Sequence, residues 1–425
     1  MERHMEKDLN FSGHNTQYAT HGLHSYAAKC PPQLVEYSLE RYSRPGDVVL
    51  DPMAGSGTTI VEAKIHQRQS IGFDIDPLAC LIARVKSNFI EDHRIENVFQ
   101  QVISATRSDL KKIKSGKRSI ELLERAKLPE FHNRDYWFEQ GVQLQLALLG
   151  ANINHLAIDE QVQEFLWVAF SGTILTKVSV ANARDIIHSR HHHLEHPNEP
   201  GVLEKFENRV RKMRKQMQEL GQRCKDTKVR AEVRMGDARA LSVASNSIDL
   251  VFTSPPYATA LDYPRAHFLA VSWMNSVLNV DLDQYKLKGE SYIGSERGKI
   301  EEHEHNKQLS PTAQAIVKRL KKIDQRKSHL IERYFCDMTD VFGEINRVLA
   351  PGKHAVIVVC PSHIRKTEIP THVVFTEIAK YLRMKLVDEQ TRTIDSRKRV
   401  LPYVRDSFGN RMSTEYVLAY KKANK

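Results

Sequence analysis

The segment VVLDPMAGSGTT, residues 48–59, decides the fold class. Its β-branched start predicts a buried strand that ends at Asp51, and Gly55 and Gly57 allow a tight turn before a helix that begins at Thr58. Backbone N–H groups at such a helix start can approach a small polar ligand closely. A strand, a glycine-rich turn and a helix in this order are typical of doubly wound α/β sheets.

The sixth position of the glycine turn narrows the choice of ligand. A dinucleotide-binding turn needs Gly or Ala there, but GSGTTI has Ile60, which argues against a pyrophosphate. S-adenosylmethionine carries no phosphate, and Asp51 could receive its ammonium group. Asp74 ends the next predicted strand, where a carboxylate accepts both ribose hydroxyls in such folds, and Asp76 shares that face. We prefer Asp74 for the ribose, and Asp237 could accept the adenine amino group.

The rest of the chain continues the alternation of strands and helices. Seven short β-branched runs predict strands, and apolar residues at helical spacing lie between several of them. The expected strands are 48–51, 70–75, 232–237, 248–254, 354–360, 384–394 and 414–421, and the expected helices are 33–42, 58–66, 77–88, 332–349 and 372–383. This alternation predicts an α/β fold with a seven-stranded, mostly parallel, doubly wound sheet whose ligands bind beyond the carboxyl ends of the strands.

A second motif, TSPPY at 253–257, follows a strand-like apolar run. Its two prolines, Pro255 and Pro256, stiffen the loop, hold Ser254 extended and cannot donate from nitrogen. The Ser254 hydroxyl and the Pro255 carbonyl could therefore accept the hydrogens of an exocyclic base amine and turn its nitrogen toward a cofactor methyl group. Tyr257 would stack on the base, which must leave a duplex to enter such a pocket.

Composition limits the class of protein further. With 425 residues, 41% of them hydrophobic, the chain can bury a sizeable core, and a net charge of +11 favours a polyanionic partner. The five cysteines are far apart and form no C-x-x-C pair, which argues against a disulfide framework or a cysteine zinc site. No apolar run approaches the roughly 18 residues of a membrane span, and no signal peptide is apparent, so we expect a cytoplasmic protein without membrane contact.

Together the motifs resemble those of the DNA amino-methyltransferases, which methylate N4 of cytosine or N6 of adenine, and in particular an SPPY-containing bacterial subfamily. The resemblance implies S-adenosylmethionine as cofactor, double-stranded DNA as substrate, and a sheet whose last strand is reversed. It rests on THGLHSYAAKCPP (20–32), PGDVVLDPMAGSGTT (45–59), IGFDIDP (71–77), GDAR (236–239) and TSPPY (253–257).

The first residue of the SPPY block bears on the target base. Family members with SPPY usually methylate the N4 amine of cytosine, whereas an acidic residue or Asn there is more typical of adenine N6 enzymes, so Ser254 points to cytosine in a specific sequence. In many cytosine enzymes this block precedes the cofactor block, whereas here it follows. The alternatives are an adenine N6 enzyme, an RNA amino-methyltransferase, and a non-catalytic nucleic-acid-binding subunit.

The resemblance also implies that the segment before the glycine turn contacts the cofactor, through His24, Tyr26 and Lys29. The other candidate cofactor residues are Asp51, Pro52, Ala54, Gly55, Gly57, Thr58, Asp74, Asp76, Asp237 and Ala238. The candidate catalytic residues are Ser254, Pro255, Pro256 and Tyr257.

Two insertions divide the catalytic domain. Its cofactor part is 1–89, its SPPY part 231–259 and its C-terminal part 332–425. Residues 90–230 are expected to be mainly helical and to recognise the target, and residues 260–331 to form a DNA-contacting lid. A cognate restriction endonuclease is a possible partner.

Arginine and lysine side chains in three regions are candidates for DNA contact, because they pair with phosphates and arginine also reads guanine edges. They are Arg184, Arg190, Arg265, Arg297, Lys398, Arg399 and Arg411. A cluster of His188, His191, His192, His193 and His196 with Glu195 lacks regular ligand spacing, so we expect no metal there.

Overall fold

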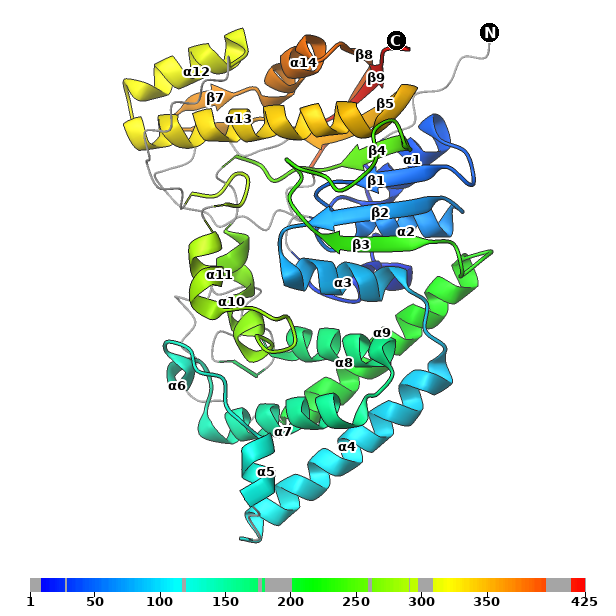
Figure 1. The fold of residues 1–425 in the computed structure, drawn as a ribbon, viewed down its shortest axis with the longest axis vertical. Coiled ribbons are helices and arrows are strands. Elements are labelled where there is room, and N and C mark those ends of the chain that lie inside the picture. Colours follow the sequence, from blue (N-terminus) through cyan, green and yellow to red (C-terminus); the bar gives the residue numbers. More distant parts are fainter. Residues whose placement is uncertain are drawn as a thin grey trace.

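The computed structural model describes residues 9–26, 29–116, 120–174, 178–179, 201–258, 262–289, 291–296, 309–394 and 414–424. Within these ranges, no helix is both long enough and apolar enough to cross a membrane. A seven-stranded sheet occupies the upper part of the molecule, and helices extend below it (Figure 1).

The sheet has the strand order β3-β2-β1-β4-β5-β9-β8. Neighbours from β3 to β5 are parallel, whereas β9 runs antiparallel to both β5 and β8. The strands are β1 (Val48–Asp51), β2 (Gln69–Asp74), β3 (Ala231–Met235), β4 (Ile248–Thr253), β5 (Leu349–Val359), β8 (Met384–Thr393) and β9 (Thr414–Lys422). The expected doubly wound α/β fold, with its last strand reversed, is confirmed.

One small element was not predicted. β6 (Ser362–Ile364) and β7 (Thr367–Ile369) pair as a separate hairpin. The two residues of its turn, Arg365 and Lys366, have φ values of +49° and +62°, as a tight hairpin turn requires. Strands of three residues are too short to show periodicity, and the turn lacks the usual Asn or Gly, so no sequence pattern marks this hairpin.

Helices cover both faces of the sheet because successive strand residues point to opposite sides. In β4, Leu250 and Phe252 are fully buried in a cluster with Leu34 and Leu39 of α1, whereas Val251 packs on the other face with α13 and α14. Since both faces are covered, the strands are apolar along most of their length. The helices of this part are α1 (Pro32–Tyr42), α2 (Thr58–Ile65), α3 (Pro77–Ser87), α12 (Pro311–Lys321), α13 (Gln325–Val348) and α14 (Thr371–Tyr381).

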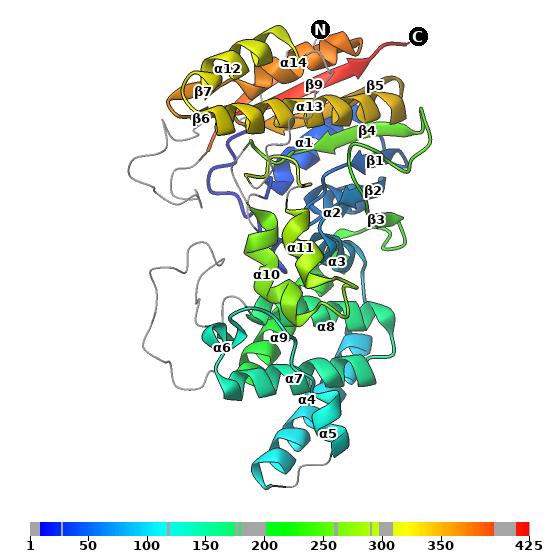
Figure 2. The same ribbon diagram turned by 60° about the vertical axis from the view of Figure 1, so that its left-hand side comes forward.

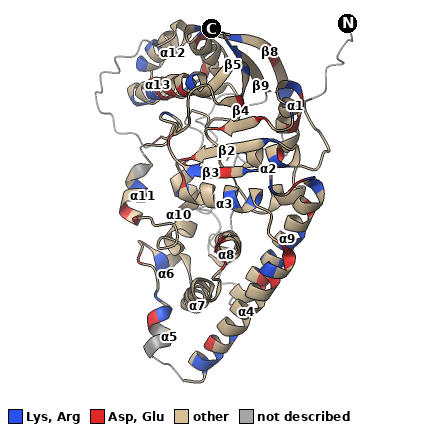
Figure 3. Cartoon of the chain, turned by 45° about the vertical axis from the view of Figure 1, so that its right-hand side comes forward, with Lys and Arg blue, Asp and Glu red and all other residues tan. Residues whose placement is uncertain are grey.

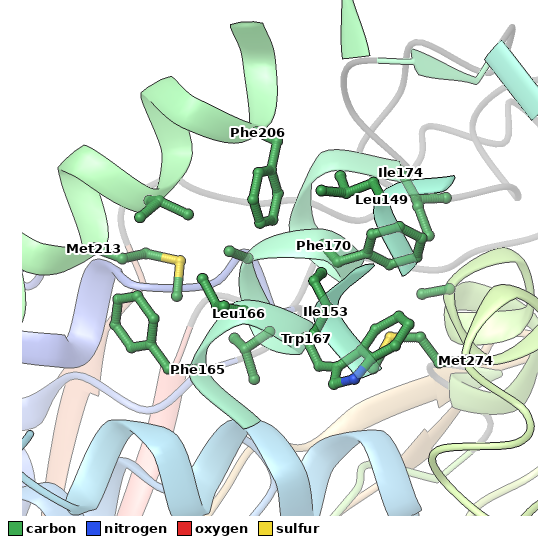
Figure 4. Close-up of a cluster of buried hydrophobic side chains, with 14 of the residues drawn as sticks. Leu149, Ile153, Phe165, Leu166, Trp167, Phe170, Ile174, Phe206, Met213 and Met274 are labelled. Carbon is green, nitrogen blue, oxygen red and sulfur yellow. The ribbon is translucent and has the colours of Figure 1, made fainter. Parts of the chain in front are cut away.

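A helical body lies beneath the β3 edge of the sheet (Figures 1 and 2). Its core joins α7, α8 and α9, and Met274, just after α10, reaches the same cluster (Figure 4). The two insertions therefore share one hydrophobic core. The helices are α4 (Asp92–Lys114), α5 (Ile120–Arg125), α6 (Arg134–Trp137), α7 (Gln140–Leu156), α8 (Glu160–Thr173), α9 (Val202–Arg223), α10 (Tyr263–Trp273) and α11 (Leu282–Lys288), and a short 3-10 helix, η1 (Ala19–Gly22), packs on α9.

The long helices α4 and α9 are held together partly by charge. Basic and acidic residues are interspersed along both helices (Figure 3). Arg214 of α9 pairs with Asp92 and Glu96 of α4, and Arg107 of α4 pairs with Glu207 of α9. These partly exposed pairs each contribute little to stability, but opposite charges on facing positions fix how the two helices align.

Candidate active site

A cleft lies where β1, β2, β3 and β4 end, at the position where the strand order reverses between β1 and β4. It contains about 910 Å³ of non-atom space, part of which opens to solvent. Ligand sites in open α/β sheets lie at this position. Thirteen predicted residues line the cleft, namely Tyr26, Lys29, Asp51, Pro52, Ala54, Gly55, Thr58, Asp74, Asp76, Asp237, Ala238, Ser254 and Pro256.

Four predicted residues are not part of the cleft lining: His24, Gly57, Pro255 and Tyr257. His24 is buried behind it, with its Nε2 3.0 Å from the Ser171 hydroxyl of α8. The structure thus places His24 at the junction with the helical body, one step removed from the cleft.

The two glycines of the turn have different roles. Gly55 has φ +50°, and a Cβ there would lie 3.3 Å from the ring of Tyr26, which lines the cleft. Gly57 has φ +81°, and a Cβ there would lie 2.8 Å from the Cβ of Ala83. Gly55 therefore shapes the ligand side of the turn, whereas Gly57 lets α2 pack closely on α3.

Groups of opposite charge face the cleft near the glycine turn. Asp51 is buried and accepts hydrogen bonds from the Thr59 hydroxyl at 2.6 Å and the Met53 N–H at 3.1 Å. Burial raises the pKa of Asp51 to about 6, although the Thr59 hydroxyl acts against the rise. Lys29 donates to two backbone carbonyls at 2.9 and 3.4 Å, and burial lowers its pKa to about 8. This pair suits a ligand that carries both an ammonium and a carboxylate.

Asp74, at the end of β2, keeps unused acceptor capacity. Its Oδ2 accepts the Gly55 N–H at 2.8 Å and its Oδ1 accepts the Asp76 N–H at 2.9 Å, so each oxygen has one protein partner and can accept more. Burial first, and the nearby charge of Asp76 second, raise the pKa of Asp74 to about 7. Two adjacent oxygens with spare lone pairs match a vicinal diol such as a ribose.

Asp76 also lines the cleft, but its carboxylate is already occupied. Its Oδ1 caps α3 by accepting two backbone N–H groups at 2.9 and 3.0 Å. Its Oδ2 contacts His267 at 3.1 Å, the Tyr285 hydroxyl at 2.9 Å and the Tyr292 hydroxyl at 3.3 Å. Burial alone would raise the pKa of Asp76, but these partners outweigh it and lower the pKa. The carboxylate that anchors the second insertion is thus Asp76, and Asp74 is the one open to a ligand.

Asp237 is held by a neighbouring guanidinium. Arg239 contacts both of its carboxylate oxygens, the shortest at 2.6 Å, and also pairs with Asp337 of α13 at 2.8 Å. Burial raises the pKa of Asp237, but the Arg239 donors outweigh it and the pKa is lowered. The carboxylate stays ionised and fixed at the wall of the cleft.

The TSPPY loop begins where β4 ends, and Ser254 and Pro256 face the cleft. Among the described residues, neither the Ser254 hydroxyl nor the Pro255 carbonyl has a hydrogen-bond partner. In contrast, the Pro256 carbonyl accepts a hydrogen bond from the Tyr334 hydroxyl at 3.1 Å. Of the two proposed acceptors, Ser254 therefore lines the cleft, whereas Pro255 is not part of its lining.

Cleft residues from the second insertion and a buried lysine beside the glycine turn were missed in the sequence. Tyr263 and Tyr292 come from the second insertion, and Tyr263 stacks on Tyr26 with a ring distance of 5.9 Å. Isolated tyrosines far along the chain carry no local signal for a cofactor site. Lys86 of α3 is fully buried with its Nζ 3.4 Å from the Ser56 hydroxyl of the glycine turn. A lysine on the apolar face of a predicted helix is the signal that could have identified Lys86.

Of the candidate DNA contacts, only one falls in the described part of the chain. Arg265 is half-buried in α10, where its backbone N–H donates to Asp262. The other candidates, Arg184, Arg190, Arg297, Lys398, Arg399 and Arg411, lie outside the described residues, as does the histidine cluster at 188–196.

Comparisons with known proteins find DNA-modifying methyltransferases. A family model described as DNA methylase matches residues 4–85. The chain is 25% identical over 394 residues to the type II methyltransferase M.MvaI of Kocuria varians, covering 88% of this chain and 83% of that one. It is 23% identical to the type II methyltransferase M.BsoBI of Geobacillus stearothermophilus, over 87% of this chain and 80% of that one. Type II methyltransferase M.MjaII of Methanocaldococcus jannaschii is 31% identical over 150 residues, 35% of this chain and 27% of that one.

The fold and the cleft define an S-adenosylmethionine-dependent methyltransferase of the doubly wound α/β class. The residues present fit this cofactor, because a buried carboxylate with spare acceptors, a second carboxylate and a lysine line one cleft. In sequence the chain resembles the DNA amino-methyltransferases, and DNA is the substrate that this similarity indicates.

Proposed function

We propose that the protein methylates the N4 amino group of cytosine in a specific sequence of double-stranded DNA. The observation that carries this proposal is Ser254, the first residue of the SPPY block, which lines the cofactor cleft and whose hydroxyl is unpartnered among the described residues. Adenine N6 methylation is the nearest alternative, since the loop could in principle hold either exocyclic amine.

The loop acts by orientation. An exocyclic amine is a weak nucleophile because its lone pair is conjugated with the base. The Ser254 hydroxyl oxygen and the Pro255 carbonyl each accept a hydrogen bond from the amine. These two bonds favour a tetrahedral nitrogen whose lone pair faces the cleft. S-adenosylmethionine, when bound, supplies the methyl group. The prolines keep both acceptors in place before the base arrives, so little reorganisation is needed.

Cofactor binding is divided among three parts of the cleft. Asp51 receives the ammonium group and Lys29 the carboxylate of the methionyl end, Asp74 accepts the ribose hydroxyls, and Asp237 accepts the adenine amino group. Support comes from the charges of the first two residues and the spare acceptors of Asp74. His24 acts indirectly in this scheme, because it lies behind the cleft.

We further propose that the insertions read the DNA. The helical insertion 90–230 recognises the target, and the second insertion, 260–331, lies over the cleft as a DNA-contacting lid. Support comes from the core that the two insertions share, from the contacts of Asp76 with the second one, and from the net charge of +11. A cognate restriction endonuclease is the partner expected for a sequence-specific enzyme of this kind.

Nucleoside mass spectrometry of DNA treated with the enzyme and labelled S-adenosylmethionine tests the base. Label in N4-methylcytosine is expected, and label in methyladenosine alone would rule out the cytosine assignment. A Ser254→Ala variant serves as the matched control and should incorporate label about tenfold to hundredfold more slowly.

Two further measurements address the remaining alternatives. Competition between duplex DNA and structured RNA for the labelled methyl group separates a DNA enzyme from an RNA enzyme. Calorimetry with S-adenosylmethionine tests for a non-catalytic subunit, which would bind DNA without binding the cofactor.

A further inference from the structure

We infer that Glu415 and Arg392 form a positioning pair that fixes the ring of Tyr257 for the target base. The inference rests on the proposed function, because it concerns the same loop and requires a base that leaves the duplex. It adds two residues, from strands at the far side of the sheet, that no motif in the sequence connects to the TSPPY loop.

The reversed strand β9 makes this contact possible. Parallel strands bring their carboxyl ends to the cleft edge, whereas an antiparallel strand brings its beginning there. Tyr416 pairs with Val359 at the end of β5, so Glu415, one residue earlier, lies just beyond that end. Only β5 separates β9 from β4, which leads into the loop. Tyr257 can therefore reach Glu415 across the end of one strand.

The contacts form a continuous chain from the loop to β8. The Tyr257 hydroxyl donates to Glu415 Oε1 at 2.8 Å, and Arg392 Nε donates to Glu415 Oε2 at 2.5 Å. Arg392 and Glu415 are directly opposite each other in the β8–β9 ladder. Their side chains are only 9% and 13% exposed, so water competes little for either partner. Each carboxylate oxygen of Glu415 thus has its own donor.

The direction of the tyrosine hydrogen bond is fixed. Burial raises the pKa of Tyr257 far above its usual value, and the charge of Glu415 raises it further. The phenol therefore remains an O–H donor at any working pH, and a donor to a carboxylate makes a stronger bond than a donor to a neutral group. With its hydroxyl held, the ring cannot rotate away from the loop without breaking this bond.

Glu415 and Arg392 are positioning residues because neither lines the cofactor cleft, while Ser254 and Pro256 do. The Pro256 carbonyl of the loop is held independently, because it accepts a hydrogen bond from the Tyr334 hydroxyl of α13. The loop is thus fixed on one side by a helix and on the other by a strand. A base entering the pocket then meets a ring already in place, which reduces the ordering needed at the reacting geometry.

A double-mutant cycle tests the inference. The variants are Tyr257→Phe, which removes the hydroxyl and keeps the ring, Glu415→Gln, which removes the charge, and the two combined. Each single change is expected to lower kcat/KM for DNA about tenfold, the loss expected for one charge-assisted hydrogen bond. The combined variant is expected to lose no more than the worse single variant, because both changes break the same contact. The Kd for S-adenosylmethionine is expected to stay within about twofold of wild type.

Tyr420→Phe is the matched control. Tyr420 is another buried tyrosine of β9, with its hydroxyl 3.0 Å from Thr376, and it lies away from the loop. Its variant is expected to leave kcat/KM for DNA unchanged, so a loss there would mean that any buried hydroxyl of β9 matters.

The outcomes separate this inference from the proposed function. Additive losses in the combined variant, or an equal loss of cofactor binding, would overturn the positioning role in an otherwise active enzyme. A wild type that methylates adenine would contradict the cytosine assignment and leave the inference intact. A wild type that methylates no nucleic acid would overturn both.

Discussion

Replacing Asp74 by asparagine should stabilise the cofactor-free protein while weakening its binding of cofactor. Burial and the charge of Asp76 raise the pKa of Asp74 from 3.8 to about 7. The folded state therefore binds this proton more tightly than the unfolded chain does, and the contribution of Asp74 to stability falls as the pH rises from about 4 to about 7. Each pKa unit corresponds to roughly 1.36 kcal/mol, so at about pH 8 the ionised carboxylate lowers the free energy of unfolding by about 4 kcal/mol.

Asparagine escapes this cost because it is neutral. It keeps one acceptor oxygen and loses one of the two backbone hydrogen bonds, which removes about 1 kcal/mol, so the net gain is roughly 3 kcal/mol at pH 8. At about pH 5 the folded Asp74 is protonated and more than half of this cost is gone, so only a small gain remains. The gain should therefore shrink several-fold between the two pH values.

Urea denaturation of the cofactor-free wild type and Asp74→Asn at both pH values measures this difference. Asp283→Asn, which changes a carboxylate that is 91% exposed, is the control and should shift the free energy of unfolding by less than about 0.5 kcal/mol. In calorimetry, Asp74→Asn should bind S-adenosylmethionine at least about tenfold more weakly, because it offers one acceptor oxygen in place of two. A variant less stable than wild type at pH 8, or a gain independent of pH, would refute the reasoning.

Three further predictions concern the same site. Ser254→Ala should lower the rate of methyl transfer about tenfold to hundredfold with little change in cofactor affinity, and an equal loss of affinity in calorimetry would show that its role is misassigned. Asp76→Ala should destabilise the protein by roughly 3 kcal/mol in urea and speed tryptic cleavage of the second insertion, because Tyr285 and Tyr292 lose a buried acceptor; unchanged cleavage would argue against an anchor. Burial, aided by Lys29, lowers the pKa of Lys86 well below its usual value, so Lys86→Met should raise the free energy of unfolding by about 1 kcal/mol or more at pH 7 and by less at pH 9. A larger gain at pH 9 would contradict that assignment.

The sheet could be predicted from the sequence because its strands are buried on both sides. All seven expected strands are present, and most boundaries agree within two residues. The largest difference is the start of β5, which begins at Leu349 and includes a Pro-Gly pair at 351–352 that reads as a turn in the sequence. The pairing register between β4 and β5 shifts at this point. β5 extends through the Pro-Gly pair because it pairs with β4 there, and the sequence does not show that pairing.

The site residues could be predicted only where a local sequence motif contains them. The glycine turn, Asp51, Asp74 and the TSPPY loop each follow a strand, and the position of the reversal in strand order brings them to one cleft. The different roles of Asp74 and Asp76 were not predictable with certainty, because they depend on donors about 190 to 215 residues away in the second insertion. The Tyr257–Glu415 contact spans 158 residues and was missed for the same reason.

The boundary between β1 and β4 has a consequence for how such an enzyme can be assembled. The glycine-turn half and the TSPPY half are each contiguous in the chain, and within the sheet they meet at two residue pairs, Val49 with Leu250 and Leu50 with Val251. The cleft depends on that meeting and on the contacts of the second insertion with Asp76, and not on which half is synthesised first. A gene that encoded the halves in the opposite order, or as two polypeptides that associate through this seam and α1, would form the same cleft from the same residues.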